Sequence, residues 1–162
     1  MGRGNSGLGK SGGGDKNILN VSVSDAEVLN RIDALPDLKG SLGEKENPIP
    51  DYAIDHGFDA WDEAFELMQN TKYDDSTPHQ FETVPMDKVF TLQAHVDPNT
   101  LKSKVNADGV ANAIYSAGGL NNNPIRAIKM GNDYILVDGN HRAALAKLAN
   151  LNKIKLEVFY PS

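Results

Sequence analysis

The stretch of residues 135–145 constrains the fold more than any other part of the sequence. It reads Ile-Leu-Val-Asp-Gly-Asn-His-Arg-Ala-Ala-Leu, an apolar run followed by a short polar turn and then by helix-forming residues. Gly139 allows the backbone to turn sharply, because glycine has no Cβ and tolerates positive φ angles. The pattern therefore predicts a buried strand, a tight turn and the start of a helix, one after another.

Polar side chains occupy this predicted helix start. Free backbone N–H groups and the positive end of the helix dipole lie at such a position, and a guanidinium and an imidazole add to its affinity for anions, phosphate above all. We therefore predict that Gly139, Asn140, His141 and Arg142 bind phosphate or a nucleotide, and that His141 and Asp138 are the catalytic residues. The competing interpretation is that Asp138 only caps the helix and Arg142 only forms a surface ion pair.

The rest of the second half alternates predicted strands with predicted helices. Pro85 interrupts the first strand, Gly118-Gly119 ends one helix, and Gly131-Asn132 is a typical hairpin turn. Because strands and helices are intermixed, the second half is expected to form an α+β domain with a mixed sheet. The expected strands are 81–90, 124–130, 134–137 and 154–159, and the expected helices are 98–105, 110–117 and 140–150.

The first half has a different character. Residues 1–80 hold 7 basic and 15 acidic side chains, a net charge of −8, whereas residues 81–162 hold 9 and 7, a net charge of +2. Ser24 and Glu27 fit a capping box, and apolar residues recur at helical spacing after them. Helices are expected at 24–35 and 60–69, with loops at 36–58 and 70–80.

These differences predict three segments. Residues 1–17 contain many glycines and few apolar side chains, so we expect a disordered tail or linker. Residues 18–80 are expected to form an acidic helical N-terminal extension, and residues 81–162 the domain proper. A linker-like start is also compatible with a terminal piece of a longer protein encoded by a phage or a mobile element.

The glycine-rich start contains a misleading match. Residues 4–11, Gly-Asn-Ser-Gly-Leu-Gly-Lys-Ser, satisfy the phosphate-loop pattern G-x-x-x-x-G-K-[ST]. That loop needs a buried strand before it and a helix after it, whereas here three glycines follow. Met1-Gly2 with Ser6 likewise fits the myristoylation pattern by composition alone. We interpret neither match as functional.

Composition excludes several classes of function. The sequence has no cysteine, which rules out disulfide scaffolds, zinc–cysteine sites, iron–sulfur clusters and thiol nucleophiles. It has no apolar run of about 20 residues and no apolar segment after the first methionine, so we expect neither a membrane partner nor a secretory signal. The expected location is cytoplasmic. The small basic excess of the second half does not indicate a strong nucleic-acid binder.

The stretch from about Val84 to Pro161 resembles the ParB/sulfiredoxin superfamily. The resemblance lies in the hairpin 124–137, the turn 138–142, the helix that follows it and the closing strand 154–158. In that superfamily a short turn of the type G-x-[HR]-R at a helix start holds the phosphates of a nucleotide or a phosphorylated substrate. The resemblance thus implies a ParB/sulfiredoxin-like fold in which Gly139, Asn140, His141 and Arg142 form the phosphate cradle.

The chain also departs from that superfamily. Sulfiredoxins need a cysteine in the turn, where Asn140 stands, so their activity is excluded. Partition-type ParB proteins continue into DNA-binding and dimerisation domains, and their turn usually carries Glu-Arg-Arg where this chain has Asn-His-Arg. The His-Arg form looks closer to ParB-like nucleases and free serine kinases. A kinase needs a carboxylate near the γ-phosphate, and Asp138 is a candidate by position.

Other polar and aromatic residues carry weaker signals. His95 with Asp97 is interpreted as part of an exposed loop rather than as a metal or base site. Asn121–Asn123 is expected to be a turn. An aromatic face of the second helix is expected to pack in the core, and an acidic face to be solvated. The aromatic face comprises Trp61, Phe65 and Met68, and the acidic face comprises Asp59, Asp62, Glu63 and Glu66.

Two functions remain open. One is an enzyme acting on phosphoesters, either a ParB-like nuclease or a nucleotide-dependent phosphotransferase. The other is a non-catalytic module that binds a nucleotide or the DNA backbone through the same turn. The candidate cofactor is a nucleotide with Mg²⁺, and the candidate partner is a nucleotide or a nucleic acid. The sequence specifies neither the metal ligands nor the oligomeric state.

Overall fold

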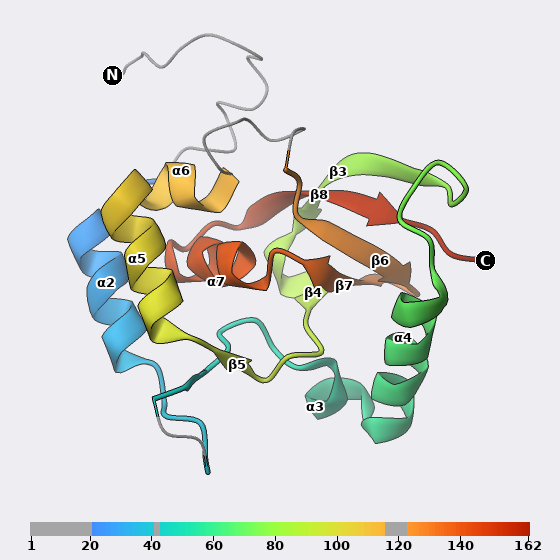
Figure 1. Cartoon of the computed structure of the whole chain (residues 1–162), viewed down its shortest axis with the longest axis horizontal. Coiled ribbons are helices and arrows are strands. Elements are labelled where there is room, and N and C mark those ends of the chain that lie inside the picture. The colour runs from blue at the N-terminus through green and yellow to red at the C-terminus, as the bar shows by residue number, and fades with distance from the viewer. Residues whose placement is uncertain (1–20, 41–42, 116–122) are drawn as a thin grey trace, which may run out of the picture.

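The computed structural model describes residues 21–40, 43–115 and 123–162 (Figure 1). The predicted tail at 1–17, the phosphate-loop match within it and the predicted Gly118-Gly119 helix stop lie outside the described residues. Helices and strands carry the labels of Figure 1.

The centre of the fold is a five-stranded mixed sheet in the order β3-β8-β6-β7-β4. β3 pairs with β8 and β6 pairs with β7 in antiparallel fashion, whereas β6 and β8, and β4 and β7, run parallel. The expected α+β class with a mixed sheet is confirmed. The strands are β3 (His79–Pro85), β4 (Val89–Phe90), β6 (Arg126–Met130), β7 (Asp133–Asp138) and β8 (Lys153–Phe159).

Helices cover the sheet on both faces. Side chains alternate along each strand, so Ala127 and Leu136 join one apolar cluster while their neighbours Ile128 and Ile135 join another. The first cluster includes residues of α2, α5, α6 and α7, and the second includes residues of α3 and α4 (Figure 1). The helices are α2 (Asp25–Ala34), α3 (Tyr52–His56), α4 (Phe58–Asn70), α5 (Pro98–Asp108), α6 (Val110–Tyr115) and α7 (Asn140–Leu148).

The elements predicted around the turn are found with small shifts at their ends. The hairpin strands pair as expected, and Gly131 between them has a φ of 59°. Helix α7 begins at Asn140, but it ends at Leu148 rather than at residue 150. Asn150 has a φ of 61° and so cannot continue the helix, a role that asparagine takes at many helix ends.

Two expectations for the rest of the chain need correction. The expected loop at 36–58 contains β2 (Lys45–Glu46), paired with β5 (His95–Val96), and helix α3. Asp51 caps α3 by accepting a hydrogen bond from the Ala53 N–H at 3.0 Å, a local signal that the glycines and prolines around it obscured.

The expected strand 81–90 is divided. A 3₁₀ turn, η1 (Met86–Lys88), separates β3 from β4, and β3 begins at His79, inside the expected loop 70–80. Pro85 is the last residue of β3, an edge strand, where a missing N–H donor is tolerated.

Helix α2 shares its core with the second half of the chain. Ser24 caps it, as predicted, by accepting a hydrogen bond from the Glu27 N–H at 3.1 Å. Val28 and Ile32 are fully buried in the same apolar cluster as Leu145 of α7. The division at residue 81 stays a prediction about independent folding, and this shared cluster argues for cooperative unfolding of both halves instead.

We predict that Ile32→Ala lowers the free energy of unfolding by about 2–5 kcal/mol, because a large aliphatic side chain leaves a buried cavity. Urea unfolding measures the change. Ile54→Ala is the control, since Ile54 is 77% exposed and its truncation should cost little. If proteolysis of the variant released a resistant fragment 81–162 with wild-type stability, the two halves would be separate folding units.

Within the described part of the chain, no helix combines the length and the apolar character that crossing a membrane requires.

Candidate functional site

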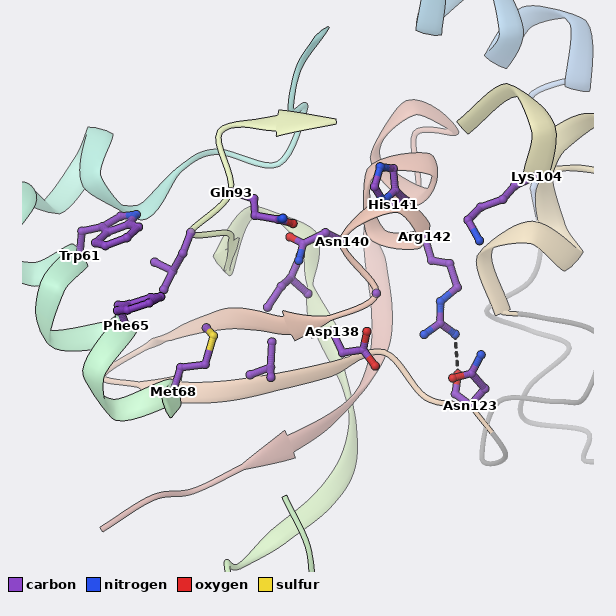
Figure 2. A pocket seen from close by; sticks show the side chains of 14 residues that line it. Trp61, Phe65, Met68, Gln93, Lys104, Asn123, Asp138, Asn140, His141 and Arg142 are labelled. Carbon is purple, nitrogen blue, oxygen red and sulfur yellow. Dashed lines mark hydrogen bonds between the residues drawn. The ribbon is translucent and has the colours of Figure 1, made fainter. Parts of the chain in front are cut away.

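A pocket of about 600 Å³ lies where β7 ends and α7 begins (Figure 2). It brings together the predicted turn, helix α4 of the first half, the segment after β4, and helix α5. All five residues of the predicted site line it. The lining residues are Trp61, Phe65, Met68, Leu92, Gln93, Lys104, Asn123, Leu136, Val137, Asp138, Gly139, Asn140, His141 and Arg142.

The turn requires glycine at position 139. Gly139 has a φ of 86° and a ψ of 28°, the left-handed region that side chains with a Cβ disfavour. A Cβ at this position would also lie 3.1 Å from two side-chain carbons of Ile125 and 3.1 Å from Nη2 of Arg142. Gly139 therefore permits both the turn and the close approach of Arg142.

The N-terminus of α7 has no side-chain cap. The backbone N–H groups of Asn140, His141 and Arg142 find no acceptor among the described residues, since the first helical hydrogen bond runs from the Ala143 N–H to the Gly139 carbonyl at 2.9 Å. The positive end of the helix dipole adds to these donors. The pocket wall therefore offers an anion hydrogen-bond donors that no described residue engages.

Asn140 is held by a residue that sequence reasoning missed. The fully buried Thr91 donates from its hydroxyl to the Asn140 side-chain oxygen at 2.5 Å, and accepts from the Gln93 N–H at 2.9 Å. Because the amide oxygen is engaged, the side-chain NH₂ of Asn140 is the group left for a ligand. No local sequence pattern identifies Thr91 as part of the site, because it lies 49 residues from Asn140 along the chain.

His141 is a neutral hydrogen-bond donor in this geometry. Its Nε2 accepts from the Asp97 backbone N–H at 3.2 Å, so the ring carries its hydrogen on Nδ1. Burial lowers its pKa, and the nearby positive charge of Lys104 lowers it further, against an opposing effect of Asp97. The lowered pKa and the hydrogen bond that Nε2 accepts both favour the neutral ring.

The His95–Asp97 pair of the sequence is not a pair in the structure. His95 lies in β5, not in a loop, and its Nε2 is 3.1 Å from a Glu44 carboxylate oxygen. Asp97 instead caps helix α5 by accepting from the Asn99 N–H at 2.9 Å. The prediction that His95 is exposed holds in part, because its side chain is 44% exposed.

Arg142 is buried, with 8% of its surface exposed. Its guanidinium donates through Nη1 to the Asn123 carbonyl and through Nη2 to the Pro124 carbonyl, the latter at 3.3 Å (Figure 2). Burial lowers the pKa of the guanidinium below its usual value, and the carboxylate of Asp138 opposes that effect. The alternative of a surface ion pair is thus wrong, and Arg142 also fixes the chain before β6. Asn123 is the one residue of the expected turn Asn121–Asn123 that the structure describes.

Two charged side chains of the pocket form no hydrogen bond or ion pair with a described residue. Asp138 is exposed and makes no hydrogen bond or ion pair with the described residues, so the capping role considered for it is wrong. Lys104 extends from α5 toward the turn (Figure 2), also without an ion-pair partner in the described ranges. Sequence reasoning missed Lys104, because nothing distinguishes it from other helical lysines.

The aromatic face of α4 lines the pocket instead of packing wholly in the core. The rings of Trp61 and Phe65 are stacked, with centroids 5.3 Å apart and planes 11° from parallel. Phe65 is 41% exposed, whereas Met68 is partly buried against the second apolar cluster. The expectation of core packing is therefore wrong for Phe65. The acidic face is solvated as predicted, with all four of its residues exposed.

No group of three or more His, Cys, Asp or Glu side chains suited to a metal ion occurs within the described ranges. Comparisons of the chain with protein-family models, with curated proteins and with solved structures found no match.

Proposed function

We propose that this protein binds the phosphate groups of a nucleotide or a nucleic acid at the turn Asp138–Arg142. The observation that carries the proposal is the set of N–H groups at the start of α7 that find no acceptor among the described residues. The residues that carry them line the same pocket as Lys104. The Asn140 amide and the remaining N–H groups of Arg142 add donors, and such convergence suits a phosphate group.

We propose further that the chain is a relative of the ParB/sulfiredoxin superfamily. The succession of hairpin β6–β7, glycine turn, helix α7 and strand β8 supports this proposal. The resemblance implies an enzyme that acts on phosphoesters, a nuclease or a nucleotide-dependent phosphotransferase, in which Asp138 and His141 are catalytic. Asp138 has an exposed carboxylate that fits Mg²⁺, which proteins often bind through one carboxylate together with substrate phosphates.

A non-catalytic binding module is the second candidate. His141 favours it, because its Nε2 already accepts the Asp97 N–H and must release it before it can take a proton from a substrate. Asp138 favours it too, because it is the sole carboxylate among the described residues that line the pocket. A nuclease site with two metal ions needs more carboxylates than one. With its hydrogen on Nδ1, His141 serves a bound phosphate as a donor.

Lys104 provides the sharpest test of phosphate binding. We predict that Lys104→Gln weakens binding of pyrophosphate and of ATP, each with and without Mg²⁺, by about 10–100-fold, the range for a hydrogen bond to a charged group. Isothermal titration calorimetry measures the affinities. Lys102→Gln is the matched control, because Lys102 lies on the same helix but pairs with Asp33 outside the pocket. Equal affinities for both variants and the wild type would contradict the proposal.

The variant His141→Ala distinguishes the two candidate functions. If the protein is an enzyme, His141→Ala should lower the turnover of a phosphoester substrate more than the affinity for it. If it is a binding module, the same change should weaken binding, and neither the variant nor the wild type should turn over the ligand.

A further inference from the structure

The side of the pocket that faces the turn is apolar and aromatic. Trp61 and Phe65 of α4 stack on each other, and Leu92 and Met68 complete the wall. Figure 2 shows the two rings on one side of the pocket and the turn with Arg142 on the other. A phosphate group alone needs no such surface, because it gains nothing from apolar contact.

Amide groups lie between these two sides. In Figure 2 the side chains of Gln93 and Asn140 lie between the aromatic wall and the side chain of Arg142. Amides donate and accept hydrogen bonds, which suits the hydroxyl groups of a sugar. A ligand that matches the whole pocket is therefore anionic at one end, polar in the middle and flat and apolar at the other end.

The helix that carries the aromatic wall is acidic on its other face, which disfavours a long polyanionic ligand. Asp59, Asp62, Glu63 and Glu66 are exposed on the helix that carries Trp61 and Phe65. A nucleic-acid strand that continued past the wall would bring further phosphates toward these carboxylates, and like charges repel. A ligand with phosphate only at the turn end avoids this repulsion.

We propose that the pocket binds a mononucleotide, with its phosphate at the start of α7 and its base against Trp61 and Phe65, rather than a nucleic-acid strand. The inference rests on the proposed phosphate binding and adds the class of ligand. The pocket volume of about 600 Å³ lies in the range of small-molecule sites. Helix α4, which the sequence assigns to the acidic extension, is thereby part of the binding site.

The single tryptophan of the chain is Trp61, so intrinsic fluorescence reports on this wall directly. The experiment titrates the full chain with each of the four ribonucleoside 5′-monophosphates, with ribose 5-phosphate, with inorganic phosphate and with an eight-residue oligothymidylate. We expect at least one nucleotide to change the fluorescence of Trp61 and to bind at least about tenfold more tightly than ribose 5-phosphate, in line with base stacking on an aromatic ring.

Phe65→Ala should remove that tenfold preference and leave the affinity for ribose 5-phosphate unchanged. Phe58→Ala is the matched control, because Phe58 lies on the same helix, is 80% exposed and does not line the pocket. Calorimetry on both variants makes the comparison independent of fluorescence, and circular dichroism verifies that each is folded.

The outcomes separate the two proposals. If ribose 5-phosphate binds as tightly as every nucleotide, the aromatic wall does not bind a base and the inference is wrong. The proposed phosphate binding at the turn would still be supported. If the oligothymidylate binds more tightly than every nucleotide, the ligand is a strand, and the inference is wrong. If no phosphate compound binds, both the inference and the proposed function fail.

Discussion

Replacing Gly139 with alanine is expected to lower the free energy of unfolding by about 3 kcal/mol and to abolish phosphate binding. The left-handed backbone at φ 86° costs a residue with a Cβ about 1–2 kcal/mol. The new methyl group would also meet Ile125 and the Arg142 guanidinium at 3.1 Å, and overpacking of this kind costs about 1–3 kcal/mol. Thermal or urea unfolding measures the first effect and calorimetry with pyrophosphate the second.

Gly131→Ala separates the two contributions. Gly131 also has a positive φ, 59°, but a Cβ there would have no atom within 4 Å. This control should lose about 1–2 kcal/mol from backbone strain alone and keep its affinity for pyrophosphate. If Gly139→Ala were no more destabilising than Gly131→Ala, the contact with Ile125 and Arg142 would not matter to the fold.

Arg142→Lys is expected to lower both stability and ligand affinity. The guanidinium bonds two backbone carbonyls and also lines the pocket, and the compact ammonium of lysine cannot reproduce that fork. We expect a loss of about 2 kcal/mol in the free energy of unfolding and a 10–100-fold loss in affinity for pyrophosphate, since each hydrogen bond to a charged group contributes about 1.5–3 kcal/mol. Sequence reasoning assigned Arg142 to the ligand alone, whereas its contacts with Asn123 and Pro124 also give it a structural role.

Arg126→Lys is the control for this change. Arg126 pairs with Glu157 at 2.9 Å, neither residue lines the pocket, and lysine keeps the positive charge at this position. It should bind pyrophosphate as the wild type does. An Arg142→Lys variant with wild-type stability and weakened binding would show that the guanidinium serves only the ligand. If the Arg142→Lys variant had both the stability and the pyrophosphate affinity of the wild type, the assignment of Arg142 to the site would be wrong.

The strand, turn and helix around Gly139 could be predicted because neighbours in sequence decide them. An apolar run followed by Asp138-Gly139 and a helix-forming stretch leaves the backbone few alternatives, since the sterics of positive φ act within one residue. The same holds for the Ser24 cap of α2 and for the exposure of the acidic face of α4, which follows from helical periodicity. Those predictions concern single elements and are confirmed.

The other half of the site could not be predicted in this way. Lys104, Thr91 and the aromatic pair of α4 come to the site from three separate segments of the chain. Their spacing along the sequence carries no signal, because contacts between distant segments depend on how all the apolar faces pack at once. An aromatic stripe at helical spacing looks the same whether it faces a core or a cavity.

The sequence by itself thus determined the turn, and it predicts an anion-binding role for the residues that follow Gly139. The tertiary structure decided what those residues do. It engages Nε2 of His141 with Asp97, uses Arg142 to hold the carbonyls before β6, and places Trp61 and Phe65 across the pocket from the turn. The physical reason is range: backbone sterics and helix dipoles act over a few residues, whereas burial, hydrogen-bond partners and pocket walls arise only when distant segments meet.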